Sequence, residues 1–445
     1  MTTESSSVLP MSPDVRLMEM PYLVTKIVLG AESKTNYREK EELVSVEWGG
    51  QVEVIHSTDF DLAKELATNV TKEWGRPSAK IAELFSPKAT LEIHRFVHDK
   101  LLAMVDHRKG RRGLVMLRDP GGCGWWRMTF PARYMSHDGW YVDITTSGLS
   151  FDALMEYHTI FVQRIYNWEQ FYILQKLKEA GKKIIYDIDD DIFHIPPHNN
   201  ASDVIGRDQM MSAIACMNLA DVVVTTTSHL VSVLREADVE SPIEIIPNAV
   251  DLKDGWLHTS STGSPDDKQR IFWAGSDTHG VDWNECLDVV SQVMDNRKNV
   301  LLVIIGACPN ALASRASRWP GRVENMLPME PETYYRILKH VRADVGLLPL
   351  ADNFFNRSKS PLKFIEYAMI GIPSVASDAQ PYNGIITHEE NGFLAKTKRD
   401  WRQGISKCLD NSKVRRDILS EARKTTQAHY DINNVASKWE KILFS

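Results

Sequence analysis

Two lysines and a glutamate lie close together in the stretch NRSKSPLKFIEYAMIGIPSVAS, which runs from residue 356 to residue 377. Lys359 precedes a helix predicted over 361–370, and Lys363 lies in its first turn, where unpaired N–H groups and the helix dipole already create positive potential. The positive charges of the lysines are unfavourable beside this positive potential. A bound diphosphate would remove the repulsion, since two phosphates match two ammonium groups and the free amides. Glu366 lies near the same helix end and can accept hydrogen bonds from sugar hydroxyls. The alternative is a solvated charged loop in which Glu366 pairs with Lys363 at i,i+3.

A second turn of the chain has the composition of a phosphate site. The apolar run RIFWAG ends at Gly275, and the residues SDTHGVD connect it to a helix predicted over 283–296. Glycine lets backbone amides approach a phosphate, and the start of the next helix adds positive potential. The pattern is common in α/β proteins, so it indicates a ligand site only together with the lysines.

Strands that alternate with helices position both stretches. Helical patterns such as 168–180 and 206–219 separate the first strands, the polar segment 251–270 interrupts the series, and helices near 331–341 and 361–370 continue it. The predicted strands are GLVMLRD, WYVDIT, HTIFVQR, KKIIYDID, DVVVTTT and IEIIPNAV before the interruption, and RIFWAGS, NVLLVIIGA, RVENMLP, ADVGLLPL, PSVAS and GFLAK after it. This alternation predicts an α/β fold with two tandem doubly wound Rossmann-like domains, which bind ligands beyond the carboxyl ends of their strands.

The N-terminal part of the chain has a different character. Residues 1–15 are rich in Ser, Thr and Pro and predict a disordered lead, whereas 16–112 predict a small α+β appendage. Its runs ELVSVEW and QVEVIHS flank Gly49 and Gly50, which is typical of a β-hairpin, and helical patterns follow near 59–75 and 86–108. The expected boundaries after the appendage are 113–255, 256–428 and a C-terminal helix at 429–445 that crosses back to the first Rossmann-like domain.

Composition excludes several classes of protein. The 445 residues carry a formal net charge of -7, which argues against a general attraction to nucleic acid. The five cysteines form no CxxC pair, so neither a disulfide framework nor a structural zinc site is indicated. The N-terminus lacks a signal pattern, and no apolar run approaches the roughly 20 residues that span a bilayer. We therefore expect a soluble, cytoplasmic protein without a transmembrane segment.

Five motifs carry a resemblance to a known family. YDIDDDIF, IIPNAVD, FWAGSDTHGVD, KSPLKFIEYAMIGIPSVAS and ENGFLA follow one another between residues 186 and 395. Together they make residues 113–445 resemble the GT-B fold glycosyltransferases of family 4, in particular a bacterial and phage branch, which would place the protein in the host cytoplasm if a phage encodes it. The resemblance implies transfer of a hexose from a nucleotide-diphosphate sugar, with retention at the anomeric carbon. It implies no required metal or other cofactor, and a UDP-sugar is favoured over a GDP-sugar as the donor.

The resemblance also assigns roles within the second domain, 256–428, which would bind the donor. Lys359 and Lys363 would hold the diphosphate, and Glu366 would bind the ribose as the second glutamate of the family's E-x7-E element. The first glutamate of that element is replaced by Ser358 in this chain, so the contact to the donor sugar is in question. The further donor-binding residues would be Gly275, Ser276, Thr278, His279, Ser360, Pro361 and Leu362, with Leu327 and Pro328 of NMLPME beside the base.

The first Rossmann-like domain, 113–255, would face the acceptor. Its loop DPGGCGWWRMTFPARYM offers glycines for close approach and aromatic rings for stacking, or else glycine turns with tryptophans in the core. The cluster DIDDD could form a metal site in which Asp187 and Asp189 are ligands. The resemblance instead favours carboxylates that cap the turn after the strand or that contact the acceptor. The expected acceptor-side residues are Gly122, Gly124, Trp125, Trp126, Arg127, Asp189 and Asp190.

The acceptor itself stays open at this stage. A glycan, a protein or a hydroxymethylated base in phage DNA is each compatible with the sequence. The DNA interpretation rests on a tryptophan that could stack on a flipped base and on the basic loop with Arg108, Lys109, Arg111 and Arg112. Two other functions compete with glycosyl transfer. A sugar-nucleotide epimerase of the same fold would release nucleotide without an acceptor, and a non-catalytic sugar-nucleotide binding protein would release none.

Overall fold

The structure is a computed structural model that describes most of the chain from residue 111 onward and parts of the region before it. The described residues are 15–17, 43–48, 51–56, 111–119, 121–135, 140–146, 148–251, 263–264, 266–329, 331–338 and 340–444. They fall into two compact units, a smaller one within Met1–Met116 and His137–His158 and a larger one within Leu117–Ser136 and Thr159–Ser445. The helices predicted near 59–75 and 86–108, together with Arg108 and Lys109, lie outside the described residues.

The smaller unit contains three parallel strands and a hairpin. Strand β5 (Trp140–Thr145) pairs with β1 (Val15–Leu17) on one side and with β4 (Arg111–Met116) on the other, and a short helix, α5 (Phe151–Leu154), follows β5. Strands β2 (Leu43–Trp48) and β3 (Gln51–His56) pair in antiparallel register with Trp48 opposite Gln51. The predicted hairpin is therefore confirmed.

Two of the residues expected in a basic loop instead belong to strand β4. Arg111 and Arg112 open this strand, and the guanidinium of Arg112 donates to Glu156 Oε2 at 2.7 Å and to Asp143 Oδ2 at 3.1 Å. The Arg112 guanidinium also lies 4.4 Å from the ring centroid of Tyr157. The expected loop character is wrong for these two arginines, because the apolar run that follows extends the strand backward to include them.

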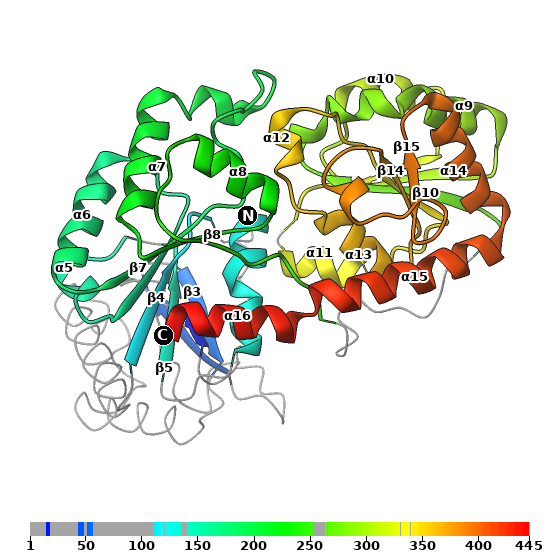
Figure 1. Ribbon diagram of the computed structural model, residues 1–445. Coiled ribbons are helices and arrows are strands. Elements are labelled where there is room, and N and C mark those ends of the chain that lie inside the picture. Colours follow the sequence, from blue (N-terminus) through cyan, green and yellow to red (C-terminus); the bar gives the residue numbers. More distant parts are fainter. Residues whose placement is uncertain are drawn as a thin grey trace, which may run out of the picture. The chain divides into compact units, whose positions relative to one another are not determined.

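The larger unit contains a first set of parallel strands that follow one another in chain order. These are β6 (Thr159–Gln163), β7 (Lys183–Asp187), β8 (Val222–Thr225) and β9 (Ile243–Ile245), and each pairs with the next. Helices α6 (Trp168–Glu179), α7 (Arg207–Leu219) and α8 (Ser228–Glu236) connect them, as Figure 1 shows. Every residue of β6 and β8 is buried, as expected for strands covered on both faces.

The second sheet of the larger unit has six described strands in the order β12-β11-β10-β13-β14-β15. They are β10 (Gln269–Gly275), β11 (Val300–Gly306), β12 (Val323–Met326), β13 (Val345–Leu348), β14 (Ser374–Ser377) and β15 (Phe393–Ala395). The chain runs outward from β10 to β12 and then returns to place β13 on the other side of β10. Such a reversal of strand order is where doubly wound sheets open a crevice at the carboxyl ends of their strands.

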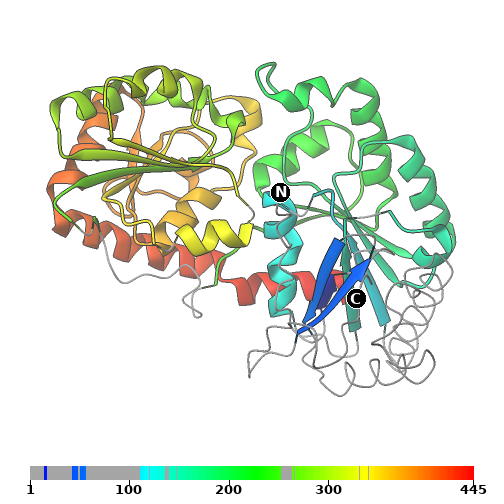
Figure 2. The ribbon, with the colours of Figure 1, turned by 180° about the vertical axis from the view of Figure 1, so that it is seen from behind.

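Helices cover both faces of this second sheet (Figure 2). Trp401 and Ile405 of α14 (Lys398–Asp410) join the core cluster that contains α9 (Leu287–Asn296) and the inward residues of the strands. Helix α13 (Leu362–Met369) packs on the opposite face, where Gly346 leaves room for the ring of Tyr367, and α15 (Ser412–Tyr430) packs against α13 and α14. The remaining described helices of this region are α10 (Asn310–Ala316), α11 (Pro331–Leu338) and α12 (Phe354–Arg357).

The last helix, α16 (Ile432–Phe444), packs on strand β6. The rings of Trp439 and Phe161 meet edge to face with centroids 5.5 Å apart. Thr159 Oγ1 donates to the carbonyl of Leu443 at 3.0 Å, and Lys183 Nζ donates to the carbonyl of Ile442 at 2.7 Å. Within the described part of the chain, every helix is too short or too polar to cross a bilayer.

Candidate functional site

Two glycines end neighbouring strands at the reversal of strand order. Gly275 closes β10 and lies opposite Gly306, which closes β11. Gly306 has a φ of +109°, and a Cβ there would lie 2.1 Å from the carbonyl oxygen of Gly275. A Cβ on Gly275 would stand 2.5 Å from the Trp273 ring and 3.2 Å from Lys363 Nζ. The backbone at this point therefore has no room for side chains and faces a lysine ammonium.

The two predicted lysines flank the start of helix α13. Lys363 lies in its first turn with Nζ 5.7 Å from the ring centroid of Trp273, and Lys359 Nζ lies 4.8 Å from the ring centroid of Phe355. Burial, followed by the charge of Lys359, lowers the pKa of Lys363 to about 8. The two ammonium groups therefore repel each other across this helix end, and a bound dianion would relieve the repulsion.

Residues Ser360, Pro361 and Leu362 connect the two lysines. Pro361 occupies the N-cap position of α13 with a φ of -75°, so its missing N–H costs the helix nothing. The amides of Phe364 and Ile365 donate back to the Pro361 carbonyl. This leaves the amides of Leu362 and Lys363 without an acceptor within the helix itself, and they follow Lys359 closely along the chain.

His279 and Asp282 connect the turn after β10 to the loop after β13. His279 Nδ1 lies 2.8 Å from Asp282 Oδ2, and the other carboxylate oxygen, Oδ1, accepts from the amide of Ala351 at 2.9 Å and from Asn356 Nδ2 at 3.1 Å. Burial and the charges of Lys363 and Lys359 lower the pKa of His279 to about 3, so the ring is neutral at pH 7. Because an ionised carboxylate can only accept, Nδ1 carries the proton and Nε2 is the acceptor nitrogen.

The roles of Asp282 and Asn356 were not predicted from local sequence patterns. Burial acts to raise the pKa of Asp282, but the hydrogen bonds from His279 and the Ala351 amide, together with the charge of Lys359, hold that pKa below its ordinary value. Both side chains are buried, and they link segments that lie about seventy residues apart along the chain. Asp282 precedes helix α9 and Asn356 lies within α12, and polar residues at such positions are too common to be specific.

The remaining donor-side residues lie along the same strand ends. Ser276 follows β10, and its Oγ lies 2.7 Å from Thr278 Oγ1 in the next short turn. Leu327 and Pro328 follow β12, and Leu327 is 73% exposed. Because β12 stands two strands from β10, these residues lie on the order of 10 Å along the sheet edge from Gly275.

Glu366 is buried, with 3% of its surface exposed, on helix α13. Tyr335 donates to Oε1 at 3.1 Å and Tyr334 donates to Oε2 at 3.3 Å, both from helix α11. Burial raises the pKa of Glu366 to about 7, while Tyr335 and Lys363 act to lower it. The alternative of a solvated charged loop is therefore wrong for this residue. Ser358, at the place of the first motif glutamate, is also buried, and its carbonyl accepts from Thr227 Oγ1 at 3.1 Å.

The predicted acceptor-side loop is a continuous helical segment. It comprises α4 (Gly122–Gly124), a π-helical turn (Trp125–Thr129) and a 3₁₀ turn (Pro131–Tyr134). Gly122 is exposed, whereas a Cβ on Gly124 would lie 2.0 Å from the carbonyl oxygen of Asp119. Gly124 therefore permits close packing of the chain on itself, whereas a side chain at Gly122 would meet nothing within 4 Å.

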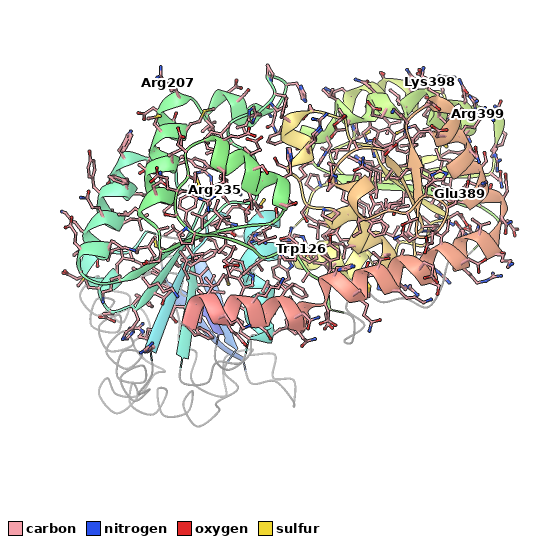
Figure 3. The ribbon with its side chains drawn as sticks, viewed as in Figure 1. Trp126, Arg207, Arg235, Glu389, Lys398 and Arg399 are labelled. Carbon is pink, nitrogen blue, oxygen red and sulfur yellow. The ribbon has the colours of Figure 1, made fainter. Side chains whose placement is uncertain are left out.

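Trp125, Trp126 and Arg127 of this segment point inward. Figure 3 shows Trp126 in the interior, whereas Arg207 and Lys398 point outward. Trp125 is 3% exposed and Trp126 is 5% exposed, so the structure places these rings in the core rather than in front of an acceptor. The core reading of the tryptophans is the one that the burial favours, because large apolar rings contribute most when water is excluded from them.

Arg127 is fully buried and forms an ion pair with Asp187. Its Nη2 donates to Asp187 Oδ1 at 2.8 Å, and its Nη1 donates to the carbonyl of Ile246 at 2.6 Å and to Asn248 Oδ1 at 3.2 Å. These contacts fix the ends of β7 and the segment after β9 to the helical segment. They also occupy the carboxylate of Asp187, which leaves it unsuited to share a metal with Asp189.

Asp189 and Asp190 gather around Arg164 beyond the end of β7. Arg164 Nη2 contacts Asp119 Oδ2 at 2.7 Å, Nε lies 3.6 Å from Asp189 Oδ1, and Nη1 lies 3.5 Å from Asp190 Oδ2. Burial and the charge of Asp189 raise the pKa of Asp190, and Lys359 acts to lower it. The structure thus brings Asp190 within electrostatic range of the donor-side lysine. One guanidinium faces three carboxylates here, which leaves the cluster acidic.

Comparison with known proteins supports one family for the second half of the chain. Residues 256–425 match the family described as glycosyl transferases group 1. No curated protein matches the sequence significantly.

Solved structures match over most of the chain. Sucrose-phosphate synthase from Thermosynechococcus elongatus is 16% identical with a TM-score of 0.55, and the match covers 75% of this chain and 98% of that one. HepE from Anabaena, solved with UDP-glucose, is 14% identical with a TM-score of 0.57 over 74% and 99%. A glycosyltransferase from Rickettsia africae is 14% identical with a TM-score of 0.54 over 76% and 99%. The chain therefore shares the GT-B fold of these solved structures, and its residues 256–425 match the group 1 glycosyl transferase domain.

Proposed function

We propose that the protein transfers a sugar from a UDP-sugar to a hydroxyl of a carbohydrate acceptor, with retention at the anomeric carbon. The observation that carries this proposal is the convergence of Lys359, Lys363 and His279 on the glycine-lined strand ends at the reversal of strand order. A diphosphate placed there neutralises both ammonium groups and faces the first amides of α13. UDP is favoured because HepE, which shares the fold, was solved with UDP-glucose.

The lysines would act on the leaving group. As the bond between the anomeric carbon and the phosphate oxygen breaks, negative charge grows on the diphosphate, and fixed positive charges there stabilise the transition state more than the ground state. The acceptor hydroxyl would attack from the face on which the phosphate leaves, and a phosphate oxygen would take its proton. This sequence retains configuration, consistent with the resemblance to family 4, and needs no protein nucleophile.

Glu366 and the edge of the sheet would hold the nucleoside. The carboxylate oxygens of Glu366 retain lone pairs beyond those used by the two tyrosines, and these can accept from ribose hydroxyls. The exposed Leu327, with Pro328, would lie beside the base, since a uridine held by its diphosphate at β10 extends about that far along the strand ends.

A neutral carbohydrate fits the acceptor side better than DNA does. The carboxylates of Asp119, Asp189 and Asp190 outnumber the guanidinium of Arg164, so a polyanion would be repelled. Carboxylates are instead good acceptors for sugar hydroxyls. Among the described residues that suggested DNA, Arg112 is held by ion pairs within its own unit and the two tryptophans are buried.

The test is a transfer assay with labelled UDP- and GDP-sugars and two acceptor classes, neutral oligosaccharides and duplex DNA that contains hydroxymethylated bases. We expect UDP release that depends on the oligosaccharide. The labelled sugar in the product should have the same anomeric configuration, α or β, as it has in the donor. Release of free nucleotide without an acceptor would identify an epimerase or hydrolase, and tight donor binding without release would identify a binding protein. Transfer to DNA alone would overturn the acceptor proposal while leaving the donor site intact.

A further inference from the structure

Tyr335 makes contacts at both ends of its side chain. Its hydroxyl donates to Glu366 Oε1 at 3.1 Å. Its ring lies nearly parallel to that of Trp125 with centroids 6.2 Å apart, and it meets the edge of Trp126 at 5.1 Å. The two tryptophans therefore fix the direction in which the hydroxyl points, and that direction ends at the carboxylate.

Tyr334 completes the arrangement from the same helix turn. Its hydroxyl donates to the other oxygen, Glu366 Oε2, at 3.3 Å, and its ring meets the ring of Tyr335 at 5.0 Å. Each carboxylate oxygen thus receives one tyrosine hydroxyl. Two donors on two oxygens fix the plane of a carboxylate, which a single donor does not, and they leave further lone pairs for a ligand.

The surroundings of Glu366 explain why these donors matter. Among the described residues, the other titratable groups that face it are Lys363 on its own helix and the tyrosines Tyr367 and Tyr382. Burial favours the protonated acid, whereas the hydrogen bonds from Tyr335 and Tyr334 and the charge of Lys363 favour the carboxylate. A protonated Glu366 would have to donate a hydrogen bond to a neighbouring acceptor, and its oxygens would accept hydrogen bonds from ribose hydroxyls more weakly than a carboxylate does.

We infer that Tyr334 and Tyr335 are positioning residues for the donor, which hold Glu366 as an oriented carboxylate that accepts from the vicinal hydroxyls of the nucleoside. This inference rests on the proposed donor site. It assigns to helix α11 a part in nucleotide recognition, and it makes the buried tryptophans a support for that recognition rather than a platform for an acceptor.

The loss of UDP binding in a Tyr→Phe variant should be largest at low pH. Glu366 already titrates near neutrality, with a pKa of about 7, and removal of either hydroxyl raises that pKa further. A Tyr→Phe variant will therefore contain more of the protonated acid at pH 6.5–7.5 and will approach the wild type only at higher pH. A purely structural loss of packing would weaken binding by the same factor at every pH.

The experiment measures the dissociation constant of UDP by calorimetry for the full chain at pH 6.5, 7.5 and 9. The variants are Tyr335→Phe, Tyr334→Phe and the pair together. Each ring is retained, and each hydroxyl is lost. The matched control is Tyr186→Phe, which removes a buried hydroxyl that donates to the Ile165 carbonyl at 2.6 Å, far from Glu366 along the chain.

We expect the double variant to bind UDP about tenfold more weakly than the wild type at pH 6.5, because a hydrogen bond to a charged group contributes about that factor. The ratio should fall to about twofold at pH 9, and Tyr186→Phe should stay near one throughout. In a Glu366→Gln background the tyrosine substitutions should no longer change the pH dependence.

Two results would count against the inference, and they differ from a failure of the proposed function. UDP binding that is unchanged in both tyrosine variants, or weakened equally at all three pH values, overturns the positioning role while the donor site stands. A wild-type protein that binds no UDP at any pH removes the proposed function and this inference with it.

Discussion

The ammonium of Lys363 lies 3.2 Å from the point that a β-carbon on Gly275 would occupy. The absence of a side chain at the end of β10 is therefore what admits the lysine to the strand ends, and the same space lets a phosphate reach backbone and ammonium together. The helix that carries Lys363 and the strand that ends at Gly275 are separated by more than eighty residues of sequence, yet they define one position.

Substitution of Lys363 by alanine should lower kcat by about two to three orders of magnitude, because one charge that stabilises the leaving diphosphate is lost. Steady-state turnover with a saturating acceptor measures the effect. Lys176→Ala, at an exposed position on α6, is the matched control and should retain wild-type turnover. Full activity in Lys363→Ala would refute the assignment.

The plot of kcat/KM against pH should be bell-shaped, with a narrow maximum between the pKa values of Glu366 and Lys363. Glu366 must be ionised, so activity falls as pH decreases through its pKa of about 7, and Lys363 must be charged, so activity falls as pH increases through its pKa of about 8. Lys363→Arg should move the alkaline limb to higher pH and leave the acid limb in place, since a guanidinium stays protonated. An alkaline limb that does not move in this variant would show that another group causes it.

Gly306→Ala should destabilise the protein by about 1–3 kcal/mol, because the residue has a φ of +109° and the new Cβ would lie 2.1 Å from the Gly275 carbonyl oxygen. Urea unfolding measures the loss. Gly122→Ala is the control, since a Cβ there meets nothing within 4 Å, and it should change stability by less than about 0.5 kcal/mol. Equal stability of the two variants would contradict the packing described at the strand ends.

Arg127→Met should cost about 3–5 kcal/mol of unfolding free energy, because it leaves the buried carboxylate of Asp187 without its ion-pair partner. The exposed Arg207→Met is the control and should be nearly neutral. A second substitution, Asp187→Leu, should recover part of the loss in the Arg127→Met background. If Arg127→Met keeps wild-type stability and instead changes only the KM of the acceptor, the acceptor-side role first expected for this arginine would be the better account.

Local patterns were sufficient to predict the two sheets and the lysine pair. Apolar runs that end in glycine, and a proline that opens a helix beside two lysines, are local features, whereas the strand order that reverses at β10 is set by tertiary pairing. The partners of Glu366 and Asp282 could not be predicted in this way. Tyr335 lies 31 residues from Glu366 and Asn356 lies 74 residues from Asp282 along the chain, so tertiary packing alone brings them together.

The burial of Arg127 was equally beyond local pattern. A charged residue after two tryptophans and several glycines is typical of an exposed binding loop, and nothing nearby in sequence announces that Asp187, 60 residues later, will neutralise it. The prediction about this segment depended on composition, whereas its structure depends on a long-range ion pair.

The contact of α16 with β6 has a consequence for how the protein is made. The ring of Trp439 covers Phe161 and also lies 5.3 Å from the guanidinium of Arg127. Residues near the beginning of the larger unit are therefore buried in part by helix α16, which is translated much later. On the ribosome the early strands emerge hundreds of residues before that helix is translated. Until α16 has been translated, Phe161 lacks the ring that covers it, so the packing of β6 is completed only at a late stage of synthesis.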